Sequence, residues 1–231
     1  MARIRKTIAA IILFLFCIAG TMQPISEAGS YVGDRNFRDE SAFKEEIDFS
    51  HIDFKRINEV IFHLTNEIRQ KHNLKTLNYS NELERAAVMH ASDMIKGSFF
   101  NHINHLDAKK KTPNDRARLC NVANPFLAEN LIEGYGLQYI SFETAYLRGK
   151  GKFSKTPEGE LIRPHTYLSF GEAQLAGWMN SKDHRKNILS KDALQMGCGA
   201  ANFINPEFND MPSFYVVQTF QWYQPIKKIN P

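Results

Sequence analysis

The stretch Trp178-Met-Asn-Ser-Lys-Asp-His-Arg-Lys-Asn-Ile-Leu189 predicts a short amphipathic helix that carries a tryptophan inward and then turns to present His184. An imidazole titrates near neutral pH, so it can act as a base, a metal ligand or a hydrogen-bonding group. A histidine between Asp183 and Arg185 is, however, more often a solvated turn residue than a ligand or base. The role of His184 therefore depends on which other side chains the fold brings to it.

Two longer helices are predicted upstream of this stretch. Apolar residues recur at helical spacing from about residue 54 to residue 73, which predicts an amphipathic helix of about four turns. Ser80 or Asn81 then caps a second helix that ends at Gly97. His90 lies on the apolar face of this helix, so we interpret it as a core histidine bound to a backbone carbonyl.

Two capping patterns predict further helices. Thr112-Pro113-Asn-Asp115 has the order of cap, first-turn proline and first-turn acid, which predicts a helix over residues 113–119. Ser169-Phe-Gly-Glu172 has the pattern of a capping box. It predicts the start of the helix that leads through Trp178 to His184.

The C-terminal part of the chain predicts strands. Residues 196–204 and 213–220 are separated by a turn with proline and asparagine, and the second segment is apolar on both alternating faces, as in a strand buried between layers. Gly197 and Gly199 indicate the close approach of another backbone. Because helices come first and strands last, we predict an α+β fold with helices on both faces of a mostly antiparallel sheet.

Residues 137–147 are rich in aromatic and β-branched residues, and turn formers and cations follow from 148 to 159. This pattern predicts two strands or extended arms joined by a solvated hairpin tip. Basic residues lie along this segment at Arg148, Lys150, Lys152, Lys155 and Arg163. They suit an anionic surface, although a charged loop is more often simply solvated.

Residues 1–28 have the layout of a secretory signal peptide, because basic residues precede an apolar run of thirteen residues from 7 to 19. A helix of that length covers only about 20 Å, so a stable transmembrane span is not expected. Cleavage after Ala19, Gly20 or Ala28 fits the small residues there, and Ala28 is the working choice. The protein is therefore expected to be extracellular, or in the periplasm or cell envelope.

Residues 29–53 show no sustained period and predict a mobile leader, followed by one domain over 54–224 and a tail over 225–231. The net charge is only +4 and no basic face is clustered, so nucleic acid is not an expected partner. Outside the cytosol, Cys120 and Cys198 form either one disulfide or two buried thiols, and the sequence leaves both open.

Few groups in the chain can carry chemistry. The sequence has no Gly-rich phosphate loop, no H-E-x-x-H zinc helix and no G-x-S-x-G elbow. His102, Glu129 and His184 remain as candidates. Two histidines and a carboxylate can bind Zn²⁺ with one open position, or act as a base and an orienting acid. They lie 27 and 55 residues apart, so spacing alone does not show that they converge.

A series of short motifs runs from about residue 57 to residue 222. It consists of Leu64-x-Asn66-x-x-Arg69, Leu77-x-x-Ser80-x-x-Leu83-x-x-Ala86, Phe99-Phe-x-His102, Thr112-Pro113-x-Asp115-Arg116, Ala128-Glu-Asn130, Trp178-Met-Asn-Ser181-x-x-His184-Arg-x-Asn187-Ile-Leu189, Met196-Gly-x-Gly199 and Tyr215-Val-Val-Gln218-x-Phe220. In order and spacing the series resembles the CAP superfamily, the cysteine-rich secretory protein and pathogenesis-related-1 type of domain, in its bacterial form.

This resemblance implies a three-layer α-β-α sandwich with a mostly antiparallel central sheet, and a cleft lined by two histidines and two glutamates. Matched residue by residue, the family motif places His102, Glu129 and His184 in the cleft, with His105 as the alternative to His102. The fourth position is a glutamate three residues after the tryptophan in the eukaryotic pattern, and here it is Ser181.

The incomplete set weakens a metal site, because an acid that would orient an imidazole or lower the charge of the metal is missing. Asp183 and Glu172 are the candidates to supply that charge. A divalent metal, zinc first, would be held by His102 and His184. A catalytic scheme that needs four residues does not transfer to this chain.

The leading hypothesis is an exported binding module whose cleft takes a divalent metal, a lipid or sterol, or a partner in the cell envelope or another protein. Two alternatives stay open. One is a metal-assisted hydrolase of the peptidase kind with Glu129 as general base or ligand. The other is a structural cell-envelope domain whose cleft is vestigial. Binding is preferred over catalysis because of Ser181.

Overall fold

The computed structural model describes residues 36–140 and 143–222. The predicted signal peptide (1–28), the start of the predicted leader and the predicted tail (225–231) lie outside these residues. Within the described residues, no helix is both long and apolar enough to cross a membrane.

The centre of the domain is a four-stranded sheet. Its strands are β1 (Asn78–Tyr79), β2 (Leu127–Tyr135), β5 (Ala193–Asn205) and β6 (Met211–Trp222), in the spatial order β1-β5-β6-β2. The short β1 runs parallel to β5, whereas β5 with β6 and β6 with β2 are antiparallel. The predicted strands over 196–204 and 213–220 are confirmed, and the sheet is mostly antiparallel as expected.

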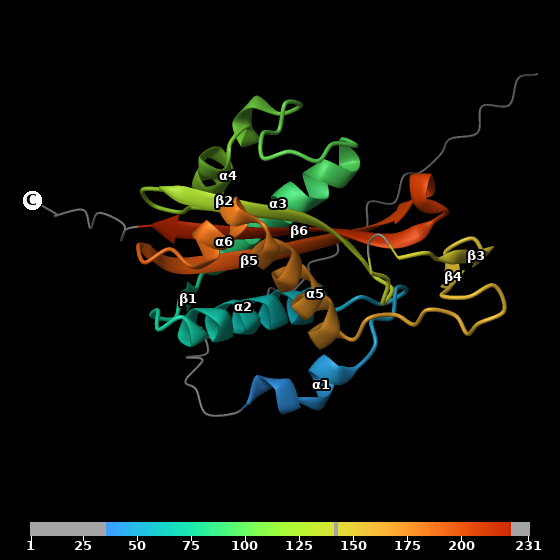
Figure 1. The fold of residues 1–231 in the computed structure, drawn as a ribbon. Helices are drawn as coiled ribbons and strands as arrows, with labels where there is room; N and C mark the ends of the chain where they lie inside the picture. The colour runs from blue at the N-terminus through green and yellow to red at the C-terminus, as the bar shows by residue number, and fades with distance from the viewer. Residues whose placement is uncertain (1–35, 141–142, 223–231) are drawn as a thin grey trace, which may run out of the picture. The chain divides into compact units, whose positions relative to one another are not determined.

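Helices cover both faces of the sheet and make a three-layer α-β-α sandwich (Figure 1). On one side lie α3 (Asn81–Lys96) and α4 (Pro113–Leu119); on the other lie α1 (Ser41–Lys44), α2 (Phe54–Lys71) and α5 (Tyr167–Asn180), which continues into α6 (Lys182–Ile188). Short 3-10 turns occupy Phe37–Asp39, Ala108–Lys110 and Pro206–Phe208. The main core packs α2 and α5 against the sheet, around residues such as Trp178, Phe170 and Val216, all of which are fully buried.

The strand β6 is buried on both faces, as its sequence predicts. Val217 packs with α3, while Val216 packs with the core that includes α2 and α5. Gly197 and Gly199 allow α3 to lie directly on β5, because a Cβ at Gly199 would come within 2.2 Å of the backbone nitrogen of Val88. Both glycines therefore mark the close backbone approach expected of them.

Two helix caps agree with the sequence prediction and one differs. The Thr112 and Asp115 side chains form the predicted capping box of α4. For α3 the cap is Ser80 rather than Asn81, and its hydroxyl accepts from the backbone nitrogen of Leu83. The predicted box at Ser169 is wrong, because α5 starts earlier with Thr166 as its cap and Ser169 as the third helical residue of the box.

A small hairpin stands apart from the main sheet. It joins β3 (Tyr146–Gly149) and β4 (Lys152–Ser154), with a turn at Lys150 and Gly151. Gly151 has a φ of +65°, a left-handed conformation that glycine adopts at no steric cost. A hairpin is present, but its position differs from the prediction. β4 lies inside the predicted tip over 148–159, and only the last two residues of the predicted arm over 137–147 belong to β3.

The N-terminal segment corrects the predicted domain boundary. Residues 36–53 are not a mobile leader, because Phe43 and Ile47 are buried in the main core and Arg38 binds Glu67 of α2 at 2.7 Å. Glu46 also forms a β-bridge with Thr166. The packed domain therefore begins near Phe37 rather than at residue 54. The segment is too short to show a helical or strand period, so the sequence does not indicate that Phe43 and Ile47 are buried.

Both cysteines of the domain are free and buried. Cys120 ends α4, whereas Cys198 lies on β5 in the main core. Burial raises the pKa of the Cys198 thiol well above its usual value. Of the two states that the sequence left open, the structure has the two buried thiols.

Candidate functional site

The site is built on two consecutive residues of β2 that face opposite layers. Side chains alternate along a strand, so Glu129 and Asn130 point to different faces of the sheet. Glu129 contacts His102 and Arg116 on the side of α3 and α4. Asn130 contacts α6 on the side of α2 and α5. The side chain of His102 and the backbone of His184 are thus held by neighbouring residues of one strand.

Glu129 is a buried carboxylate with a full set of partners. Its side chain is 3% exposed, and Arg116 Nη2 donates to both carboxylate oxygens at 3.0 and 2.8 Å. His102 Nδ1 lies 3.0 Å from Oε1. Burial alone would raise the pKa of Glu129, but the hydrogen bond from His102 and the charge of Arg116 outweigh it and hold that pKa below its usual range. The carboxylate is therefore ionised and is a poor base.

His102 is the exposed member of this group. Its side chain is 48% exposed, and it comes from the loop that follows α3. Because Glu129 is ionised, it accepts the hydrogen bond from Nδ1 of His102, and Nε2 of the ring takes no part in this contact. His102 rather than His105 makes the contact with Glu129.

His90 lies next to Glu129 and supports the loop that carries His102. It is fully buried, and its Nε2 donates to the backbone oxygen of Asn101 at 2.9 Å, as expected of a core histidine bound to a carbonyl. Burial lowers the pKa of His90 to about 4, with the opposing charges of Glu129 and Arg116 nearby. His90 is therefore neutral at pH 7, and it fixes the residue that precedes His102.

On the opposite face, a chain of buried amides connects α2 to α6. Gln218 of β6 donates to the Thr65 hydroxyl at 2.8 Å and accepts from Asn130 Nδ2 at 3.1 Å. Asn130 Nδ2 also donates to the backbone oxygen of His184 at 3.2 Å, and its Oδ1 accepts from Asn187 at 2.9 Å. The main chain of α6 is therefore fixed to β2 at His184 itself.

Arg69 fixes the end of α6 from another side. This arginine is 1% exposed, and its Nη1 donates to the backbone oxygens of Ile188 and Ser190, both at 2.8 Å. Ile188 is the last residue of α6, so its carbonyl has no intrahelical partner, and Ser190 follows the C-cap of the helix. Arg69 is thus a structural residue that sets the position of α6.

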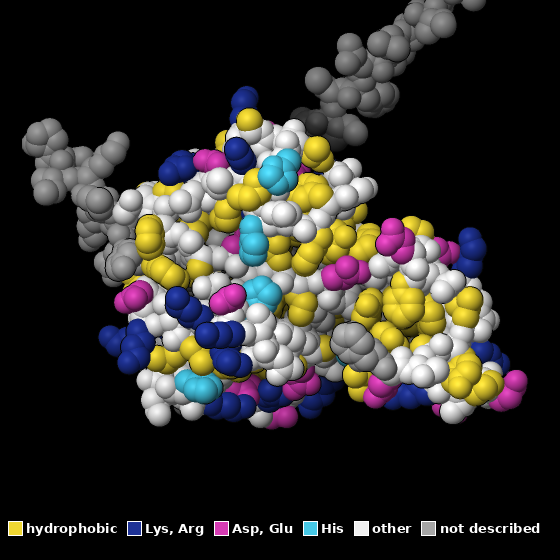
Figure 2. All heavy atoms as spheres, turned by 45° about the horizontal axis from the view of Figure 1, so that its top comes forward, with side chains coloured by type: hydrophobic (Ala, Val, Ile, Leu, Met, Phe, Trp, Pro, Cys, Tyr) yellow, Lys and Arg dark blue, Asp and Glu magenta, His cyan; other side chains and the backbone are white. Residues whose placement is uncertain are grey.

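His184 is half-buried at the border of the sheet. Burial lowers its pKa, and the nearby imidazole of His102 lowers it further, while Asp183 opposes the shift. No direct contact joins His184 to His102 among the described residues, and the two side chains are held from opposite faces of β2. Figure 2 shows histidine side chains in a row across this face of the molecule.

The missing fourth acid is not replaced. Ser181 lies at the junction of α5 and α6, and its hydroxyl makes no capping hydrogen bond. Glu172 cannot serve, because it binds Arg38 at 2.5 Å near the N-terminal segment. Asp183 is exposed and acts on His184 only through its charge.

These residues do not fit a resident zinc ion. Structural and catalytic zinc sites use three or four protein ligands. Among the described residues, no group of three or more histidine, cysteine, aspartate or glutamate side chains is arranged to hold a metal. Arg116 donates to both oxygens of Glu129, so a metal at this carboxylate would have to compete with a buried guanidinium.

Sequence reasoning missed two members of this site. Arg116 was part of a motif but had no role, and Gln218 was treated only as a residue of a buried strand. A signal for Arg116 was present, because a lone glutamate between apolar neighbours needs a buried cation to compensate its charge. No signal in the sequence indicates that Gln218 meets Asn130.

The comparisons with known proteins agree with this fold. The family model described as the cysteine-rich secretory protein family matches residues 62–220. Two curated relatives come from Bacillus subtilis strain 168: the uncharacterized membrane protein YlbC, 30% identical over 139 residues, and the uncharacterized protein YkwD, 27% identical over 139 residues. These matches cover 60% of this chain, but only 30% of YlbC and 40% of YkwD.

A solved structure of an extracellular protein containing a SCP domain, from Bacillus anthracis, is also similar. It is 25% identical, with a TM-score of 0.50, over 74% of this chain and 41% of that chain. The chain therefore spans less than half the length of these relatives. Because the family model covers most of the chain and the sandwich is present, this chain belongs to the cysteine-rich secretory protein (CAP) family.

Proposed function

We propose that this chain is an exported binding module that holds its ligand at the surface formed by His102, Glu129 and His184. The observation that carries the proposal is the state of Glu129. Its two oxygens accept from Arg116 and its pKa is held low, so it is neither a general base nor a free metal ligand. The imidazoles remain as hydrogen-bonding groups at the surface.

The same observation disfavours the hydrolase. A metal-assisted hydrolase needs a held metal with an open position, or a base that can take a proton from water. The described residues offer neither arrangement at this surface. Binding needs only the exposed ring of His102, which Glu129 holds, and the half-buried ring of His184, whose backbone Asn130 holds.

Export is supported by the predicted signal peptide and by the similar structure from Bacillus anthracis, which is described as extracellular. N-terminal sequencing of the protein recovered from the cell envelope or the medium tests this step. The expected first residue is Gly29. Protein that starts at Met1 and stays in the cytosol would contradict export.

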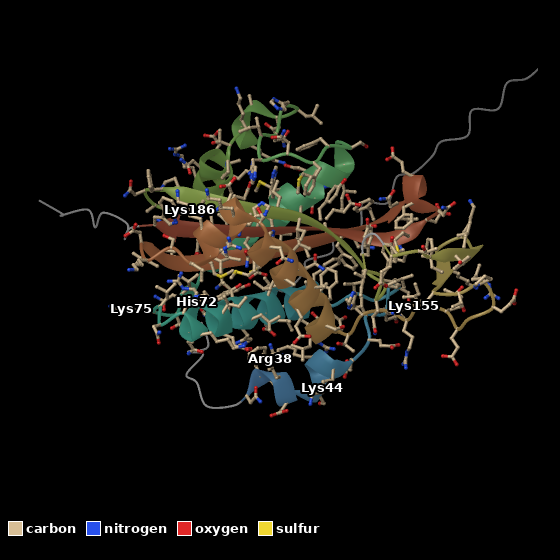
Figure 3. The ribbon with its side chains drawn as sticks, in the orientation of Figure 1. Arg38, Lys44, His72, Lys75, Lys155 and Lys186 are labelled. Atoms are coloured by element: carbon tan, nitrogen blue, oxygen red, sulfur yellow. The ribbon has the colours of Figure 1, made fainter. Side chains whose placement is uncertain are left out.

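Binding is tested with one panel of ligand classes. The panel contains a random-dodecamer display library, phosphatidylglycerol vesicles, and cholesterol. We expect one class to bind with an affinity that falls at least tenfold in the double variant His102→Ala/His184→Ala, and not in His72→Ala, an exposed histidine labelled in Figure 3 on the end of α2.

Two other outcomes decide between the alternatives. Turnover of fluorescent casein that needs zinc and is lost in His184→Ala would establish the hydrolase instead. If no class binds and no turnover appears, the structural domain with a vestigial cleft is favoured.

A further inference from the structure

The hairpin of β3 and β4 is extended by a third segment into a small ribbon with two different faces. Tyr146 pairs with Ser154, and Ser154 forms a β-bridge with Leu161. Side chains directly opposite each other on paired strands point to the same face, so these three residues share one face. Phe153, the neighbour of Ser154, points the other way and is buried in a small core with Ile162. The face with Tyr146 is therefore turned away from that core.

This outer face of the ribbon is apolar although it is exposed. Tyr146 is 40% exposed and Leu161 is 48% exposed, on either side of the buried Ser154. Four of the ten large hydrophobic side chains that are exposed in the described part of the chain lie between residues 140 and 161. Figure 2 shows hydrophobic side chains gathered at the end of the molecule where Figure 1 places the hairpin. Single exposed apolar side chains are ordinary, but such a concentration indicates a contact surface.

Two lysines beside this face are available to an anionic partner. Lys152 lies two residues before Ser154 in β4, so its side chain is on the outer face, and Lys155 follows β4. Both are exposed, and neither forms an ion pair within residues 36–140 and 143–222. The other three cations of the segment already have acidic partners, in the pairs Arg148–Glu158, Lys150–Asp210 and Arg163–Glu46.

The ribbon is held in place by backbone contacts at both of its edges. At the turn, the backbone nitrogen of Gly151 donates to the backbone oxygen of Asn209 at 2.9 Å. Along β4, the backbone nitrogen of Ile162 donates to the backbone oxygen of Phe153 at 2.7 Å. In Figure 1 the hairpin projects from one end of the sandwich. The exposed side chains are therefore carried on a supported, projecting tip.

We propose that Tyr146, Leu161, Lys152 and Lys155 form a docking tip for the surface of an anionic lipid bilayer. The two apolar side chains enter the boundary between headgroups and acyl chains, where tyrosine is favoured because its ring is apolar and its hydroxyl is polar. The two lysines contact the anionic headgroups. A soluble anionic polymer would pair with the lysines but leave the apolar side chains in water. The tip uses different residues from the proposed ligand surface, so the proposal goes beyond the proposed function.

The experiment measures co-sedimentation of the exported protein with large lipid vesicles. The protein is used as recovered after export, because the apolar run of residues 7–19 would itself enter a bilayer. We expect vesicles of equal parts phosphatidylglycerol and phosphatidylcholine to bind at least about tenfold more tightly than vesicles of phosphatidylcholine alone. The difference should shrink as salt is added, because salt screens the lysines.

Two double variants separate the apolar and the charged contributions to binding. Tyr146→Ser/Leu161→Ser should weaken binding by about tenfold or more, because two half-exposed apolar side chains no longer leave water. Lys152→Ala/Lys155→Ala should weaken it by about tenfold or more, since each basic residue near an anionic bilayer contributes about fivefold.

Matched controls change similar residues elsewhere on the surface. Leu119→Ser removes an apolar side chain on α4 that is 50% exposed. Lys75→Ala/Lys186→Ala removes two exposed lysines that lie at the opposite end of the molecule from Lys155 (Figure 3). Both controls should bind the vesicles as the unchanged protein does.

A tryptophan on the tip reports insertion without removing apolar surface. In Tyr146→Trp, vesicles with bromine-labelled acyl chains should quench the added fluorescence on binding. The unchanged protein gives the background, because it carries only Trp178, which is fully buried, and Trp222, which is partly buried. Urea unfolding of every variant checks that the domain remains folded.

The outcomes separate this inference from the proposed function. Vesicle binding that is unchanged in both hairpin double variants overturns the docking tip. Binding that is lost only in His102→Ala/His184→Ala also overturns it, and assigns the lipid to the proposed ligand surface. Binding that needs the hairpin and survives the histidine variant supports the tip, even if no ligand class depends on the histidines and the proposed function fails.

Two further results would replace the bilayer by another occupant. Soluble polyphosphate that binds as tightly as the vesicles, with no loss in Tyr146→Ser/Leu161→Ser, would show that the partner is an anionic polymer. A Tyr146→Trp signal that changes with protein concentration and not with vesicles would show that a second copy of the chain covers the tip.

Discussion

Replacing Arg116 by methionine should destabilise the protein strongly, because it leaves the Glu129 carboxylate buried without its main partner. The arginine is 1% exposed. It donates to both oxygens of Glu129 and to the backbone oxygens of His102, at 3.2 Å, and Lys110, at 3.0 Å. Methionine fills a similar volume, so the loss is mainly electrostatic.

The expected size follows from the burial of the pair. Removing one partner of a buried ion pair typically costs about 3–5 kcal/mol, because the remaining charge is desolvated and unpaired. The half-exposed ring of His102 compensates only in part, so we expect a loss of about 3 kcal/mol or more at pH 7. This is a large share of the stability of an ordinary domain, which is about 5–15 kcal/mol.

Urea unfolding at pH 7, followed by circular dichroism, measures this loss. The double variant Arg116→Met/Glu129→Gln removes the stranded charge, so it should be more stable than Arg116→Met alone. Arg118→Met is the matched control. It lies on the same helix in an exposed pair with Asp115, and should cost about 1 kcal/mol or less.

The pH dependence gives an independent check. In the native protein the pKa of Glu129 is depressed, so its contribution to stability is present above the ordinary carboxylate pKa and lost as pH falls through the lower folded value. Without Arg116, burial should raise this pKa, and the deficit of the variant should shrink as the pH is lowered toward 5. A loss below about 1 kcal/mol, or a double variant no more stable than Arg116→Met, would refute the reasoning.

Three further changes have definite expected outcomes. Gly199→Ala places a Cβ against the backbone of Val88 and should lower the free energy of unfolding by about 3 kcal/mol or more in urea titrations, whereas Gly177→Ala meets only the tip of the Ile132 side chain and should cost under about 1 kcal/mol. His90 has a pKa of about 4 in the folded protein, so on acidification the unfolded chain takes up a proton at this residue at a higher pH than the folded chain does. The free energy of unfolding should therefore fall by up to about 3 kcal/mol as the pH drops from 6.5 to 4. His90→Gln should flatten that part of the pH profile measured by calorimetry. Zinc at 0.1 mM should stabilise the protein by well under about 1 kcal/mol in thermal melts, because the described residues offer no three-ligand set; a stabilisation of several kcal/mol would show that a metal site forms after all.

Local patterns predicted the elements that depend on local chemistry. The cap and proline at Thr112 and Pro113 fixed the bounds of α4, and the spacing of apolar residues gave α2 and α3. Gly197 and Gly199 indicated the close approach of another backbone, and that backbone belongs to α3. Thr166 was missed because Ser169, three residues later, offers an equally good cap when the tertiary contacts are unknown.

For the candidate site, the sequence named His102, Glu129 and His184 but not the contacts that position them. His102 and Glu129 do meet, at 3.0 Å. The role of Glu129, however, depends on Arg116. The sequence around α4 does not indicate that this arginine points toward the sheet. The placement of His184 depends on Asn130 and on contacts between residues far apart in the chain. Contacts between residues far apart in the chain leave no periodic pattern in the sequence.

The buried amide of Gln218 also constrains how the sheet can assemble. If β6 paired one residue out of step, Gln218 would turn from Thr65 and Asn130 to the opposite face, where Ala87, Ala91 and Met94 of α3 form an apolar surface. The amide would then be buried without a donor or acceptor, which costs about 1–3 kcal/mol before any apolar contact is lost. The network that holds α6 beside β2 therefore also discriminates against misaligned folding intermediates.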